Sequence, residues 1–235
     1  MNTVLPKAHE RNLLPRGFSL VELLVVVAIM LVVAAFTVPV MISAVRAGKL
    51  RGAASDYANV LQTARMRAVQ DDRYYSVYTQ PANGNVPQLA YVDIYPQAIN
   101  GASGTGAPPV GSYQAGPPAD PMVVLSSDVV PQARGAAPNP VDLETKFCAS
   151  CGAFVGGGPI KNTAPTFGPE GVPCTPIVSV GGTGTVCNSS GGISAYETFF
   201  QSTPTQAWVA VTLTPAGRIK TWYYNAGSGT WAPQD

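Results

Sequence analysis

The stretch "RGFSLVELLVVVAIMLVVAAFTVPV", residues 16–40, is apolar enough to span a membrane, yet it carries one carboxylate, Glu22, near its start. Residues 23–36 contain no polar side chain, and the apolar character continues to Val45. A helix needs roughly 20 such residues to cross about 30 Å of hydrocarbon. The sequence therefore predicts a membrane-spanning helix over residues 18–45, in which a lone acid indicates a function.

Three kinds of amino-terminal segment could explain this apolar run. A secretory signal peptide has an apolar region of about 7 to 15 residues and a small-residue cleavage site. Here the run is longer, and Val45-Arg46-Ala47 is a poor site of that kind. A plain signal anchor gives Glu22 no role, since an ionised carboxylate at the bilayer centre costs about 2.5 to 3.5 kcal/mol on insertion scales. A pilin-type leader followed by a retained helix is the third alternative.

The residues around Gly17 carry a specific motif. A short basic leader ends in Gly17 and is followed by "FSLVELLVVVAIM". This arrangement resembles the prepilin signature G-F-S/T-x-x-E of type IV pilins and type II secretion pseudopilins. The resemblance implies that residues 1–17 are a leader peptide, that a prepilin peptidase cuts between Gly17 and Phe18, and that the enzyme methylates the new amino group of Phe18.

The resemblance also implies a location. Three Lys or Arg residues precede the span and three follow it closely, so charge alone gives no orientation. Prepilin leaders are cut on the cytoplasmic side. We therefore expect a single-pass protein of the bacterial inner membrane, with a cytoplasmic amino terminus and a periplasmic head, which is later assembled into a pilus or pseudopilus.

Cleavage after Gly17 would give Glu22 a cationic partner. The amine of Phe18 would lie one turn away, about 6 Å of helical rise, and the helix dipole favours a carboxylate there by a few tenths to about 1 kcal/mol. In the family the acid pairs with the amine of a neighbouring subunit, so Glu22 is expected to guide filament register, because an unpaired buried charge is penalised. Pro39 matches a proline common in the family; it is expected to kink or melt the helix locally, or to be simply tolerated in a membrane helix.

Beyond the apolar run the helix is predicted to continue to Gln70, with residues 46–72 as its amphipathic half. Apolar residues recur there at three- and four-residue spacing, which is typical of a helix with one buried face. They are Leu50, Ala54, Tyr57, Leu61, Ala64 and Ala68. The pattern stops at Asp71-Asp72. One half of the helix would span the membrane and the other would pack under a soluble head.

Residues 73–235 are predicted to form this head, and the fold class is α+β, with a long pilin-like helix packed on antiparallel strands. The apolar spacing changes to two after Asp72, so that residues 73–80 and 88–96 form a hairpin around "PANGNVP". Residues 96–121 are rich in Gly and Pro and are expected to be an insertion. Shorter strands are expected at 122–127, 176–180 and 195–200.

The clearest strand pair lies in "AWVAVTLTPAGRIKTWYYN", residues 207–225. Proline and glycine hold suitable turn positions within residues 214–217. On one face, predicted cross-strand contacts join Val209, Val211 and Leu213 to Ile219, Thr221 and Tyr223. The opposite face then carries Trp208, Arg218, Lys220, Trp222 and Tyr224.

This hairpin, "LQTARMRAVQDDRYYSVY" (61–78) and "PTFGPEGVP" (165–173) resemble the FimT/GspH branch of minor pilins and pseudopilins. That branch typically has a long helix with "AR..A" near its end, a β-rich head, and a late "p.G" turn that leads into a basic strand. The insertion and the cysteine region have no counterpart in that pattern. The resemblance therefore covers the helix more fully than the head.

Four cysteines lie in the head: Cys148, Cys151, Cys174 and Cys187. A C-x-x-C pair can indicate zinc, but the second close pair of a zinc ribbon is missing, and a thioredoxin-like centre needs a βαβ context. An even count in a head outside the cytoplasm favours structural disulfides. Of three possible connectivities we favour Cys148 with Cys151 and Cys174 with Cys187. No metal site and no cofactor are expected.

The predicted function is structural: a minor pilin or pseudopilin of a type II secretion pseudopilus or a type IV pilus. Its expected partners are prepilin peptidase, other pilins or pseudopilins and the inner membrane. An enzyme is not expected, because the only histidine, His9, lies in the leader and no other catalytic set is visible.

The alternative is a FimT-type minor pilin that binds DNA for uptake. The FimT pattern "GRxR" is nearly matched by Gly217-Arg218-Ile219-Lys220, and Trp222 follows. Basic side chains contact phosphates and aromatic rings stack on bases, so Arg218, Lys220 and Trp222 are the candidate DNA-binding residues. Two charges are few and the net charge is only +1, so a solvated strand face explains the same pattern.

Overall fold

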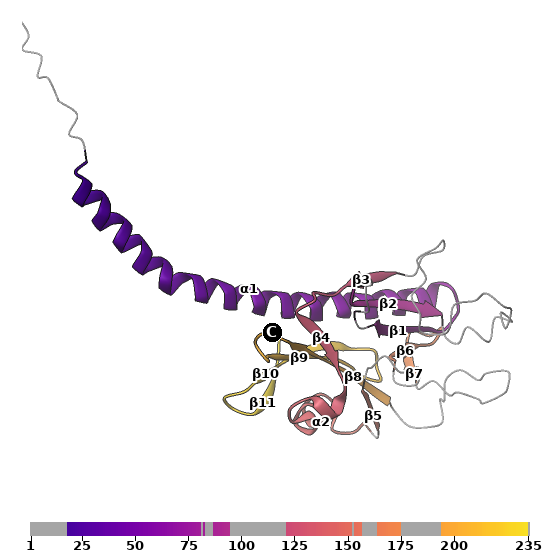
Figure 1. The fold of residues 1–235 in the computed structure, drawn as a ribbon. Coiled ribbons are helices and arrows are strands. Elements are labelled where there is room, and N and C mark those ends of the chain that lie inside the picture. Colours follow the sequence, from indigo (N-terminus) through magenta and orange to yellow (C-terminus); the bar gives the residue numbers. More distant parts are fainter. Residues whose placement is uncertain are drawn as a thin grey trace, which may run out of the picture. The chain divides into compact units, whose positions relative to one another are not determined.

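The computed structural model describes residues 18–80, 82, 87–94, 121–151, 153–156, 164–174 and 194–234. Its fold is α+β, as predicted, and begins with one long helix, α1 (Leu20–Gln70) (Figure 1). The chain divides into two compact units, Met1–Ile42 and Ser43–Asp235. The boundary falls inside α1, so the first unit is the apolar half of the helix and the second contains the amphipathic half and the head.

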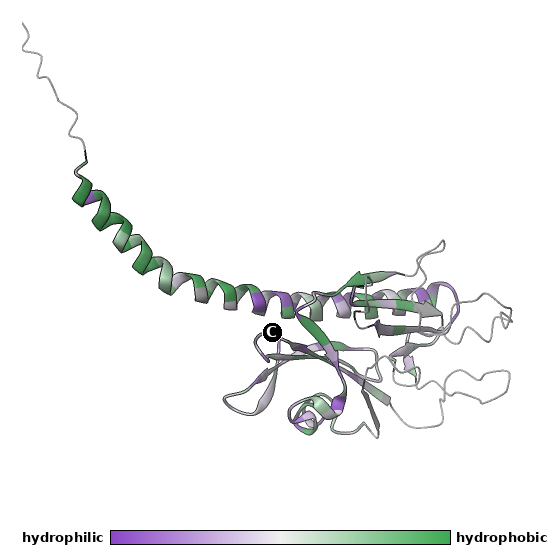
Figure 2. Ribbon diagram, in the orientation of Figure 1, coloured by the Kyte–Doolittle hydropathy of each residue, from purple (hydrophilic) through white to green (hydrophobic). Residues whose placement is uncertain are grey.

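The first half of α1 is apolar on every side (Figure 2). Its large apolar side chains from Leu20 to Ile42 are 43% to 80% exposed. Among the described residues α1 is the one helix long and apolar enough to cross a membrane, judged by length and composition. The helix begins at Leu20 instead of Phe18, and it runs through Pro39 without interruption, so local melting at that proline is not seen.

The second half of α1 has one buried face. The six residues predicted for that face are each 3% exposed or less, which confirms the prediction. The ring of Tyr57 packs edge-on against that of Phe200, with 5.2 Å between centroids, and the hydroxyl group hydrogen-bonds to that of Thr198 at 3.1 Å. The helix ends at Gln70, as predicted, and Asp72 takes a positive φ of 51° just after it.

Two sheets make up the head. The five-stranded sheet has the order β3-β2-β1-β6-β7, and the six-stranded sheet has the order β11-β10-β9-β8-β4, with β5 pairing in parallel to β8. Their strands are β1 (Tyr75–Gln80), β2 (Leu89–Ile94), β3 (Met122–Val124), β4 (Val129–Gln132), β5 (Ala153–Gly156), β6 (Thr166–Phe167), β7 (Pro173–Cys174), β8 (Ser194–Ser202), β9 (Trp208–Leu213), β10 (Ile219–Asn225) and β11 (Thr230–Pro233).

Both predicted hairpins are present. Strands β1 and β2 pair antiparallel, and β9 and β10 pair with Ile219 opposite Leu213, Thr221 opposite Val211 and Tyr223 opposite Val209. The other strand predictions are met in part. Strand β3 is shorter than the predicted 122–127 and β8 is longer than 195–200. The predicted strand at 176–180 and, apart from Pro121, the predicted insertion at 96–121 lie outside the described residues.

One main core joins α1 to both sheets. It contains the buried face of α1 together with Val77 and Val92 from the five-stranded sheet and Val209 and Val211 from the six-stranded sheet. The predicted inward face of the last hairpin therefore does point at the helix. The two sheets share α1 as their common support.

A second layer covers the other face of the six-stranded sheet. It consists of a 3₁₀ turn, η2 (Arg134–Ala136), and a helix, α2 (Pro140–Cys148), which was not predicted from the sequence. Figure 1 shows α2 across this sheet from α1. The second core between α2 and the sheet contains Ala137, Leu143, Phe199, Ala210, Trp222 and Trp231. The hairpin face that the sequence leaves to solvent is thus largely covered.

Candidate functional site

The amino-terminal end of α1 holds the residues with the most specific sequence signal. Gly17 lies outside the described residues, and Phe18 is 79% exposed. The hydroxyl oxygen of Ser19 accepts a hydrogen bond from the backbone N–H of Glu22 at 3.1 Å. Ser19 therefore caps the helix and explains its start at Leu20. Glu22 is exposed in the first turn, where the helix dipole favours its negative charge.

A second cluster gathers around Arg65, on the amphipathic half of α1. The guanidinium Nη1 donates to the carbonyl oxygen of Gly217 at 3.2 Å. A Cβ atom at Gly217 would lie 3.1 Å from the Arg65 Cζ, and one at Gly171 would lie 3.5 Å from its Nε. Both glycines have positive φ, 80° and 69°. The three stretches that resemble the FimT/GspH pattern thus meet at Arg65, and their shared residues have a structural role.

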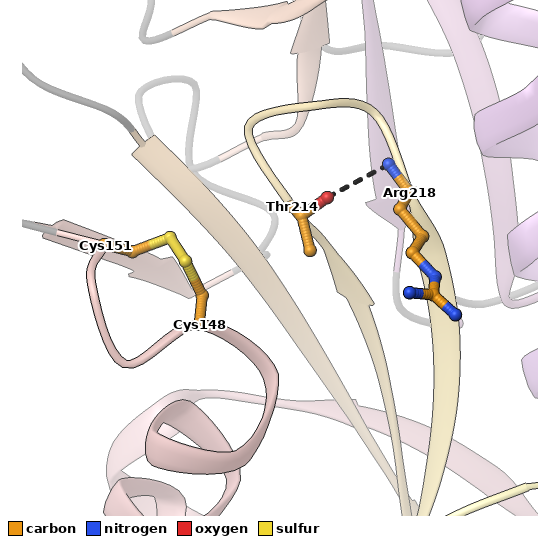
Figure 3. The surroundings of a disulfide bond; sticks show 4 residues. All are labelled: Cys148, Cys151, Thr214 and Arg218. Atoms are coloured by element: carbon orange, nitrogen blue, oxygen red, sulfur yellow. Dashed lines mark hydrogen bonds between the residues drawn. A yellow bond between two sulfur atoms is a disulfide. The ribbon is translucent and has the colours of Figure 1, made fainter.

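The candidate DNA-binding residues lie on the β9–β10 hairpin, but they are not equally accessible. Arg218 is exposed, and its backbone N–H donates to the hydroxyl oxygen of Thr214 at 3.1 Å (Figure 3). The ammonium group of Lys220, which is half-buried, lies 5.5 Å from the ring centroid of Trp222. Trp222 itself is only 4% exposed, and its indole N–H donates to Thr212 at 2.9 Å. Because α2 covers it, Trp222 cannot stack on a base, and the structure removes it from the candidates.

The cysteines form disulfides in the described part of the head. Cys148 and Cys151 are bonded, with 5.4 Å between their Cα atoms, as the sequence favours (Figure 3). This bond ties the last residue of α2 to the segment that leads into β5. Cys174 is also disulfide-bonded. The pairing proposed for it cannot be followed in the structure, because Cys187 lies outside the described residues.

Three charged side chains that the sequence did not single out meet beneath the second layer: Arg134 of η2, Glu144 of α2 and Glu197 of β8. Arg134 Nε donates to Glu144 Oε1 at 2.7 Å and lies 3.0 Å from Glu197 Oε1. Glu197 is 0% exposed and Glu144 7%. Burial is the main reason why the pKa of Glu197 is raised to about 8. The negative charge of Glu144 raises this pKa further, whereas the positive charge of Arg134 lowers it.

Comparison with known protein families gives a match at the amino-terminal end of the chain. Residues 15–38 match the family described as the prokaryotic N-terminal methylation motif. The chain therefore carries a type IV prepilin-like motif at the position of the predicted cleavage site, which implies a substrate of prepilin peptidase that assembles with other pilins. Together with the apolar half of α1, the motif fits a membrane-anchored pilin. No curated protein and no solved structure matches the chain significantly.

Proposed function

We propose that the protein is a minor pilin or pseudopilin, a non-enzymatic structural subunit of a type IV pilus or a type II secretion pseudopilus. The observation that carries the proposal is the methylation motif at residues 15–38, which continues into a helical half whose described large apolar side chains are exposed. A helix of this kind needs lipid or protein around it, since water is a poor solvent for it. A filament of packed subunits supplies protein when the helix leaves the membrane.

The exposed face of the amphipathic half also suits packing of helices. It carries a stripe of small or uncharged residues at four- and three-residue spacing, namely Gly48, Gly52, Ser55, Asn59 and Gln62. Nothing lies within 4 Å of a Cβ placed at Gly48 or Gly52. Small residues let helix backbones approach closely. This stripe therefore supports the assembly of several long helices side by side.

In this proposal Gly17 and Phe18 flank the cleaved bond, Phe18 carries the methylated amine, and Glu22 guides assembly. Before assembly Glu22 lies near the cytoplasmic headgroups, where its charge is tolerated. In the filament it faces the amine of a neighbouring Phe18, and a misaligned subunit leaves a buried charge unpaired. The head lies in the periplasm, and Pro39 either kinks the helix or is tolerated within it.

The test is assembly of Glu22→Ala. We expect the variant to insert and to be cleaved normally but to enter filaments at least about tenfold less, because a lost pairing of about 1.4 kcal/mol corresponds to a factor of ten. Glu170→Ala, which removes an exposed acid of the head, is the matched control and should assemble normally. The measurement is the fraction of the protein in sheared filaments relative to the membrane fraction. Normal assembly of Glu22→Ala would show that the acid does not guide register.

DNA binding is the second candidate, and it now rests on Arg218 and Lys220 without Trp222. Arg218 is exposed at the hairpin turn, where a phosphate could reach it. A gel shift with the mature chain in detergent should then show binding whose salt slope falls by about 2 when both residues are changed to alanine. Arg73→Ala, at another exposed arginine, is the control. Absence of binding at low salt eliminates this candidate.

A further inference from the structure

The Arg134–Glu144–Glu197 cluster joins three elements that are distant in sequence. Arg134 has one proton on Nε, and that proton is donated to Glu144. Glu197 lies close to the same nitrogen, yet neither of its carboxylate oxygens accepts a well-aligned hydrogen bond from the described residues. A fully buried carboxylate without such bonds is strongly disfavoured. Arg134 Nη2 also contacts Glu144, so within the described residues Glu197 lacks a well-placed donor.

A proton held between the two carboxyl groups supplies that donor. Glu144 Oε1 and Glu197 Oε1 lie 2.7 Å and 3.0 Å from the same Nε of Arg134, so one nitrogen brings two buried carboxyl groups together. Two ionised carboxylates only accept hydrogen bonds and repel each other, whereas one protonated carboxyl group can donate to the other. Pairs of carboxyl groups that share a buried site hold one proton for this reason.

The remaining charged groups nearby are already engaged. On α2, Lys146 Nζ donates to Asp142 at 2.9 Å and to the carbonyl oxygen of Trp231 at 2.7 Å. On β10, Lys220 lies over Trp222. Strands β4, β5 and β9, which pair with β8, contain no charged residue. Arg134 is thus the cation that faces Glu197, and its single charge is opposed by two carboxyl groups.

We propose that Glu144 and Glu197 share one proton beneath Arg134, and that this proton acts as a latch that holds η2 and α2 against β8. Loss of the proton leaves two negative charges facing each other in a buried site. The η2 side of the layer then loosens from β8.

The direction of the pH effect follows from the raised pKa. The folded state binds the proton up to about pH 8, whereas an unfolded glutamate releases it near 4.5. The stability that the latch contributes is therefore complete below about pH 4.5 and is lost as the pH rises through about 8. Below neutral pH the layer is closed, and in mild alkali it opens.

Tryptophan fluorescence is a selective probe of this layer. The chain has three tryptophans, and all of them belong to the second core or pack against it. Trp222 and Trp231 are buried there, and Trp208 is partly buried beside them. Loosening of the layer admits water to these indoles and shifts their emission to longer wavelength.

The experiment is a pH titration of tryptophan emission with the full mature chain in detergent, from about pH 6 to about pH 10. We expect a red shift with a midpoint near pH 8. Glu197→Gln, which keeps the shape of the protonated acid, should abolish the transition. Glu144→Gln should move the midpoint to lower pH, because the charge that opposes ionisation of Glu197 is gone. Glu170→Gln is the exposed control and should titrate like the natural sequence.

Constant emission of the natural sequence across this range overturns the proposal, and so does an unchanged transition in Glu197→Gln. If Glu197→Gln fails to fold, infrared spectroscopy of the natural sequence decides. The latch predicts a carbonyl band of a protonated carboxylic acid at neutral pH that disappears in mild alkali. Absence of that band at neutral pH overturns the proposal as well.

Discussion

The two halves of α1 share one continuous backbone but differ in what surrounds their side chains. From Leu20 to Ile42 the helix is apolar on all sides and none of its large apolar side chains is buried. From Ser43 to Gln70 it has one buried face and one polar face, and the head covers the buried one. A helix that is apolar on all sides needs lipid or protein around it. The buried face of the second half is covered within one subunit.

The largest difference between the halves is expected from removal of an aromatic ring. Tyr57→Ala should lower the free energy of unfolding of the head by about 3 to 5 kcal/mol, because a fully buried ring leaves a cavity and the hydrogen bond to Thr198 is lost. Phe36→Ala is the matched change in the first half, where the ring is 74% exposed, and should leave that free energy unchanged. Denaturant unfolding of the full chain in detergent measures both.

Equal effects of the two substitutions would contradict the comparison. A loss of head stability in Phe36→Ala would mean that the apolar half is covered by its own head. That result would contradict the proposal that the apolar half needs lipid or neighbouring subunits around it.

Two glycine substitutions with smaller expected effects compare the side of the second half that contacts the head with the side that does not. Gly217 lies in the head, has positive φ and contacts Arg65 of α1, so Gly217→Ala should destabilise the head by about 1 to 2 kcal/mol because alanine disfavours the left-handed backbone. Gly52 lies on the exposed face of the helix with open space around it, so Gly52→Ala should stabilise the head by about 0.5 to 1 kcal/mol. Thermal unfolding of both variants checks the opposite signs, and a loss of stability in Gly52→Ala would mean that the exposed face is already covered.

Periodic patterns allowed the sequence to predict much of this fold. The buried face of α1 follows from three- and four-residue spacing, and the β9–β10 register follows from alternation around a turn with proline and glycine. The disulfide between Cys148 and Cys151 follows from proximity and compartment. For the helix face and the hairpin, the signal lies within short stretches of neighbouring residues.

The second layer was missed because its signals are short or distant. Helix α2 has only 9 residues; its start is marked by Pro140 in the first position and by the preceding Asn139, at φ 44°. Without that helix, the alternation of residues places Trp222 on an exposed face. The Arg134–Glu144–Glu197 cluster joins residues far apart in the chain, and no spacing rule brings them together.

The central claim is that the chain is processed as a prepilin, so that the apolar half of α1 stays on the mature protein. Intact-mass measurement of the protein purified from its membrane tests this most directly. The account predicts the mass of residues 18–235 plus one methyl group on Phe18. A chain that retains residues 1–17, or one cut beyond the apolar half of the helix, would contradict it.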